Sequence, residues 1–178
     1  MDWKFLFTSF EGRIGRKQFW LGAVVLVIAG MVVALLLSTL FGFGMFGAMN
    51  EMQIAMMPDV DTQMDMMMRT GWVNLLIFLI FLWPSAALSF KRRHDRGAAG
   101  TEIWVFYALE AVLLLLQVTG LAYSVYEIDG LAMAGPNLLT AILSFVLGIF
   151  GLYLLVVIGF LKGDTGPNAY GADPQENI

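Results

Sequence analysis

His94 and Asp95 are adjacent residues whose side-chain types suggest catalytic chemistry. His94 is the chain's single histidine, and it lies beside Asp95 in the basic segment from Lys91 to Gly97. A histidine next to a carboxylate suggests general base catalysis, but adjacent side chains on a helix diverge. No local motif marks a serine or cysteine as a nucleophile, and one histidine lacks the further ligands of a zinc site. We therefore expect no catalytic residue, no metal and no enzymatic activity.

The cations around this pair favour a surface role instead. We expect Asp95 to form an ion pair with Arg13 or Arg16, because arginine offers a carboxylate two parallel donors. Arg92 and Arg93 are expected to contact anionic headgroups, with about 1 kcal/mol of attraction each. The basic run is short and lies close to an apolar segment, which argues against nucleic acid as a partner.

Glu110 is the ionisable residue expected deepest in an apolar segment, about seven residues past its start, or roughly 10 Å. Gln117 and Ser124 follow at intervals of seven, which would place all three on one helix face. Two interpretations stay open. We favour a protonated Glu110 that hydrogen-bonds another helix, because no second buried charge is available for a relay. The alternative is a proton or substrate site of a small transporter or channel.

Methionines crowd the segment between about residues 42 and 71, which we expect to be an outer loop. The first group recurs at helical spacing and the second surrounds Asp65: Met45, Met49, Met52 and Met56, then Met64, Met66, Met67 and Met68. This spacing favours an amphipathic helix whose methionines pack on an apolar surface. Asp65 and Arg69, four residues apart, favour a helix that continues into the next segment. The alternative is periplasmic Cu(I) handling, with the second group of thioethers as ligands.

The elements that position these residues are membrane spans. Only 13% of the 178 residues are charged and 59% are hydrophobic, whereas charged residues make up about a quarter of soluble domains. A span needs about 20 apolar residues, and four segments qualify, at about residues 19–41, 72–90, 103–126 and 137–161. We therefore expect an all-α polytopic membrane protein, a bundle of four transmembrane helices in a single domain over residues 1–178. The absence of cysteine excludes disulfides and thiolate sites.

Basic residues are sorted by their position relative to these spans. Nine of the ten precede the first span, separate the second from the third, or follow the fourth, and Arg69 is the exception. The positive-inside rule therefore predicts that both termini, including a tail over about residues 162–178, are cytoplasmic.

Three motifs lie on this predicted cytoplasmic face. They are FEGRIGRKQFW at residues 10–20, KRRHDRGAAG at residues 91–100, and GDTGPNAYGADP at residues 163–174. In this order they resemble the bacterial inner-membrane proteins catalogued as domain of unknown function 805. Arg93 and Thr101 depart from the family pattern, which usually has an apolar residue and a tryptophan near these positions. The resemblance implies a location in the bacterial inner (plasma) membrane and an architecture, and it implies no activity.

These observations predict a non-enzymatic integral protein of the inner membrane. It would bind anionic lipid or a partner protein through a cytoplasmic face of arginine, histidine and aspartate side chains. The candidate residues of this face are Gly12, Arg13, Arg16, Arg92, Arg93, His94, Asp95 and Asn168. The expected partners are membrane lipids, with a homo-oligomer or a membrane protein partner left open. No nucleic acid and no cofactor are expected.

Overall fold

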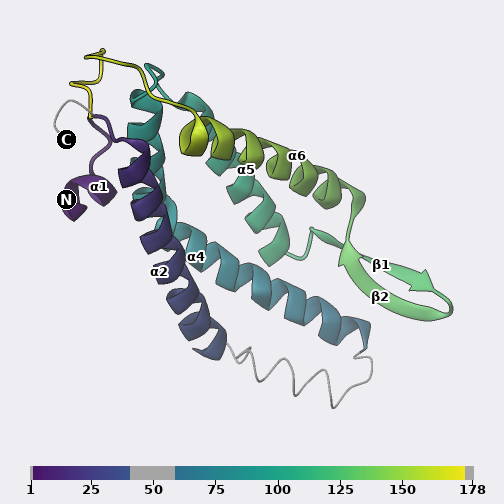
Figure 1. Cartoon of the computed structure of the whole chain (residues 1–178). Coiled ribbons are helices and arrows are strands. Elements are labelled where there is room, and N and C mark those ends of the chain that lie inside the picture. Colours follow the sequence, from purple (N-terminus) through teal and green to yellow (C-terminus); the bar gives the residue numbers. More distant parts are fainter. Residues whose placement is uncertain (1, 41–58, 175–178) are drawn as a thin grey trace. The chain divides into compact units, whose positions relative to one another are not determined.

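The computed structural model describes residues 2–40 and 59–174, and they form a mostly helical fold with one β-hairpin (Figure 1). The helices are α1 (Trp3–Thr8), α2 (Arg16–Leu40), α4 (Val60–His94), α5 (Thr101–Val118) and α6 (Leu138–Leu154). The chain continues from α6 as a π-helix, η1 (Leu155–Phe160), and the strands are β1 (Tyr123–Ile128) and β2 (Leu131–Pro136). Four helices of this fold are long and apolar enough to cross a membrane, namely α2, α4, α5, and α6 together with η1.

The β-hairpin corrects the prediction of an all-α fold and of a third span that reaches residue 126. Helix α5 ends at Val118, because Gly120 follows with a φ of +77° that right-handed helices do not allow. Strands β1 and β2 then pair antiparallel. Asp129 and Gly130, which lie between the two strands, each have a positive φ, as a two-residue hairpin turn requires. Ser124 therefore lies on a strand and not on a helical stripe with Glu110.

Helix α4 begins at Val60, so the second half of the predicted outer loop, which was expected to reach about residue 71, is helical. Asp59 precedes the helix, and its Oδ1 accepts a hydrogen bond from the backbone N–H of Thr62 at 2.9 Å, as a helix N-cap does. The ion pair between Asp65 and Arg69, at 2.7 Å, confirms the predicted helical continuation. The second methionine group, from Met64 to Met68, is thus helical. The first group, from Met45 to Met56, lies outside the described residues.

The chain divides into two compact units, and each is described by itself. The terminal unit comprises Met1–Ala29, Leu79–Ala108 and Leu147–Ile178, and the central unit comprises Gly30–Phe78 and Leu109–Val146. The core of the terminal unit joins α1, α2, α4 and η1, through Leu6, Ile14, Phe19, Leu88, Val157 and Ile158. Helices α2 and α4 pack closely there, since a Cβ on Gly22 would lie only 2.8 Å from Leu88 Cδ1.

Candidate functional site

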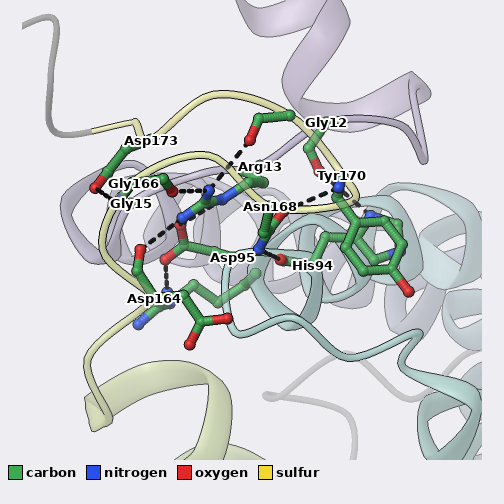
Figure 2. Close-up of polar contacts among 12 residues, drawn as sticks. Gly12, Arg13, Gly15, His94, Asp95, Asp164, Gly166, Asn168, Tyr170 and Asp173 are labelled. Carbon is green, nitrogen blue, oxygen red and sulfur yellow. Dashed lines mark hydrogen bonds and ion pairs between the residues drawn. The ribbon is translucent and has the colours of Figure 1, made fainter.

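Asp95 lies at the centre of a buried ion-pair network in the terminal unit (Figure 2). Arg13 donates to Asp95 Oδ1 from Nε at 3.2 Å and from Nη2 at 3.1 Å. Arg92, one helical turn before Asp95, donates from Nη1 to Asp95 Oδ2. The three side chains are 1%, 0% and 4% exposed for Arg13, Arg92 and Asp95. The predicted pairing of Asp95 with Arg13 is therefore confirmed.

The same Arg13 side chain fixes the C-terminal tail. Its Nη1 donates to the carbonyls of Gly166 at 2.7 Å and Gly171 at 3.2 Å, and its Nη2 donates to that of Asp164 at 2.7 Å. A guanidinium has five N–H donors, and the two bonds to Asp95 together with these three use all of them. Figure 2 shows Arg13 enclosed by the tail and Asp95. The N-terminal segment, the end of α4 and the tail thus meet at one side chain.

The tail approaches Asp95 so closely that glycine is required beside it. The backbone N–H of Asp164 donates to the Asp95 carbonyl at 2.7 Å. A Cβ on Gly163 would lie 2.6 Å from Asp95 Cγ and 2.9 Å from its carbonyl oxygen, closer than van der Waals contact allows. Gly97 has a φ of +64°, and a Cβ there would lie 2.7 Å from Asp164 Oδ2. These two glycines let the tail close over the network.

Side chains also cap the C-terminal end of η1. The last carbonyls of a helix lack partners within it and form its negative end. Arg92 donates to the carbonyls of Ile158, from Nε at 2.8 Å, and of Leu161, from Nη2. The three other donors, with the carbonyls that they reach, are Arg96 to Val157 at 3.1 Å, Trp20 to Gly159 at 3.0 Å and Arg16 to Phe160 at 3.3 Å. Five successive carbonyls, from residue 157 to residue 161, therefore each accept a side-chain hydrogen bond.

Lys91 caps the short helix α1 in the same way. Its side chain is buried, and its Nζ donates to the carbonyls of Phe5 at 3.0 Å, Leu6 at 2.9 Å and Ser9. An ammonium group has three donors, and each has an acceptor here. Lys91 thereby attaches the N-terminal helix to the end of α4.

The burial of Arg92 overturns the prediction that this side chain contacts lipid headgroups, whereas for Arg93 such contact stays a prediction. Arg92 is fully buried and bonded to Asp95 and η1. Arg93 forms an ion pair with Glu102, and its side chain is 13% exposed. The carbonyls at the end of η1 are the reason for the burial of Arg92, because buried acceptors without a donor cost about 1–3 kcal/mol each. Arg92 supplies a donor to two of them. Arg16 is exposed and bonds Phe160 rather than Asp95.

His94 joins the same region through its ring. The imidazole stacks on Tyr170 of the tail, with 4.0 Å between ring centroids and 3° between planes. Its Nδ1 lies 3.3 Å from the Gly12 carbonyl, and Asn168 donates from Nδ2 to the His94 carbonyl at 2.9 Å. The structure thus brings together six predicted residues, Gly12, Arg13, Arg92, His94, Asp95 and Asn168. Lys91, Tyr170 and Gly163 were not among the residues predicted for this site, although they lie in the motifs at residues 91–100 and 163–174.

Burial and the neighbouring cations shift the pKa of the Asp95 carboxyl in opposite directions. Burial raises the pKa of Asp95 above its ordinary value, and the neighbouring guanidiniums of Arg92 and Arg13 act against this rise. Loss of either arginine would therefore raise the pKa of Asp95 further. The network consequently depends on both cations to keep a carboxylate in a buried position.

Glu110 and Gln117 lie in the central unit and line a pocket with Asn74 of α4. Glu110 was expected to hydrogen-bond another helix, but within residues 2–40 and 59–174 no hydrogen bond joins it to a partner.

The helical methionines at positions 64 and 66–68 point in different directions from the axis of α4, because successive residues differ by about 100°. Met64 and Met66 therefore do not share a helix face, and the four sulfurs do not converge from α4 alone.

Comparison with known proteins agrees with the motifs. The family model described as "Protein of unknown function (DUF805)" matches residues 7–172. The chain is 29% identical to "Uncharacterized protein YiiR" of Escherichia coli strain K12 over 168 residues, which cover 94% of this chain and 87% of that protein. The protein of the same name in Escherichia coli O157:H7 matches equally. No solved structure matches this chain.

Proposed function

The chain belongs to the DUF805 family, and we propose that it is a non-enzymatic protein of the bacterial inner membrane that binds anionic lipid through its terminal unit. The terminal unit would face the cytoplasm, since it holds nine of the ten basic residues and cytoplasmic segments of membrane proteins are enriched in Lys and Arg. The four long apolar helices supply the membrane anchor.

The observation that carries this proposal is the sorting of cations inside the terminal unit. Arg13 and Arg92 are buried in the network, and Lys91 is buried against α1. Four other basic residues of the unit are exposed, namely Lys4, Arg16, Lys17 and Lys162. Lys4 follows Trp3 directly, and Lys17 precedes Trp20 by three residues. Trp3 and Trp20 are 45% and 37% exposed. Tryptophan with lysine is the combination that favours the headgroup region of a bilayer.

The network contributes to this proposed binding by fixing the positions of the exposed cations. Arg16 sits at the start of α2 and bonds Phe160 at the end of η1, and Lys162 follows that end by two residues. This hydrogen bond therefore holds the start of α2, which carries Arg16, next to the segment that carries Lys162. Each cation at an anionic surface contributes about 1 kcal/mol.

Lipid retention tests the proposal. The chain is purified from vesicles of phosphatidylglycerol and phosphatidylcholine, and the phosphatidylglycerol that remains bound in mild detergent is counted by native mass spectrometry. Lys4→Gln, Lys17→Gln and Lys162→Gln together should weaken retention roughly a hundredfold, as the loss of three such charges implies. Arg69→Gln, an exposed cation of the central unit, is the control and should have little effect. Retention equal in the triple variant and the wild type would refute lipid binding and favour a protein partner for this surface.

A further inference from the structure

We propose that the central unit binds a lipophilic amine, an organic ammonium ion, in the pocket lined by Glu110, Gln117 and Asn74. This site is separate from the proposed lipid-binding surface, because all of its residues belong to the central unit. The pocket has a volume of about 320 Å³, at the small end of the roughly 300–1,000 Å³ typical of small-molecule sites.

Glu110 lies at the depth where a charge is most costly in a membrane. It is the tenth residue of the 18-residue helix α5, or about 14 Å along an axis of about 27 Å. An uncompensated charge near the middle of a span costs several kcal/mol, and acidic residues there generally face a partner or a cavity. Glu110 faces a cavity.

The counter-charge for this carboxyl is missing from the part of the chain that the structure describes. None of the basic residues lines the pocket. Arg69, which precedes Asn74 on α4, forms an ion pair with Asp65 at 2.7 Å. Among residues 2–40 and 59–174, Glu110 also has no hydrogen-bond partner. A cationic ligand would supply both the charge and the hydrogen bonds.

The other walls of the pocket match an ammonium group on an apolar skeleton. The side-chain carbonyls of Gln117 and Asn74 are acceptors, so together with the Glu110 carboxylate they offer partners for the three N–H donors of a primary ammonium. The remaining lining is apolar and consists of Ile77, Phe78, Leu113 and Leu114. These side chains would pack against the hydrocarbon part of the ligand. An anion is disfavoured because the carboxylate would repel it.

The experiment uses the full chain in lipid nanodiscs, with empty nanodiscs as the background. Equilibrium binding of tritiated phenylbutylamine is compared with that of phenylbutanol, which has the same skeleton and a neutral hydroxyl in place of the ammonium. The amine should bind saturably with one site per chain and at least about tenfold more tightly than the alcohol, since a charge-assisted contact replaces a neutral one.

Variants identify the pocket as the site. Glu110→Gln should weaken amine binding about tenfold or more and leave the alcohol unchanged, whereas Glu127→Gln, which neutralises an exposed acid of the same unit, should change neither. Asn74→Leu with Gln117→Leu should weaken the amine severalfold, and this variant serves if Glu110→Gln does not fold. Amine binding that is absent, no tighter than alcohol binding, or insensitive to these substitutions would overturn the proposal.

Discussion

Arg13 donates to Asp95 across 82 residues of sequence, with 3.1 Å between Nη2 and Oδ1 and both side chains buried. Arg92 completes the network from the other carboxylate oxygen. A buried carboxylate with one of its cations removed is strongly destabilised, by about 3–5 kcal/mol for typical buried pairs. The contact therefore couples the N-terminal segment to the end of α4, and through the remaining Arg13 donors to the tail.

Arg13→Lys should destabilise the terminal unit although it keeps the positive charge. A lysine has three donors on one nitrogen and cannot reach the five acceptors that surround the guanidinium. We expect a loss of about 2 kcal/mol, in line with unsatisfied buried acceptors, measured by chemical denaturation in detergent. Arg16→Lys is the matched control, since Arg16 is exposed and makes one bond to Phe160. Equal losses in the two variants would contradict the role given to Arg13.

Gly163→Ala should disturb the network without altering any charge. The added Cβ would lie 2.6 Å from Asp95 Cγ, and overpacking of this kind costs about 1–3 kcal/mol. Gly148→Ala in α6 is the comparison, because nothing lies within 4 Å of the Cβ position there. Thermal unfolding should show a lower Tm for Gly163→Ala alone. A Tm for Gly163→Ala equal to that of Gly148→Ala would show that the tail does not pack against Asp95.

Lys91→Met should release helix α1 while leaving the rest of the terminal unit folded. Methionine fills a similar volume but leaves the carbonyls of Phe5, Leu6 and Ser9 without their donor. Hydrogen exchange followed by mass spectrometry should be faster in peptides covering residues 3–8 and unchanged in those covering α5. Unchanged exchange in the N-terminal peptide would mean that Lys91 does not hold α1.

The proposed topology is tested with single cysteines, which the natural sequence lacks. Asp61→Cys and Asp129→Cys should react with a membrane-impermeant maleimide in intact cells. Thr165→Cys, in the exposed part of the tail, should react only after the cells are opened. The reverse pattern would place the terminal unit outside the cell.

Hydropathy and charge predict the positions of the four long helices and the Arg13–Asp95 contact, because both residues fall next to a predicted span end. The hairpin was missed although Asp129-Gly130 is a strong turn signal, since the apolar run through Tyr126 matched a span equally well. The burial of Lys91 and Arg92 could not be predicted. A charged residue favours the surface by composition, and sequence does not reveal that two other helices end nearby with carbonyls lacking donors. The stacking of His94 on Tyr170 likewise has no signal in residue spacing.

A double-mutant cycle between Arg13 and Asp95 tests the network most directly. The free energy of unfolding is measured for the wild type, Arg13→Met, Asp95→Leu and the double variant, in the same detergent. Contacting buried charges should give a coupling energy of at least about 1.5 kcal/mol, so the double variant is much less destabilised than the sum of the single ones. Additive effects, within about 0.5 kcal/mol, would contradict the claim that this pair joins the N-terminal segment to the end of α4.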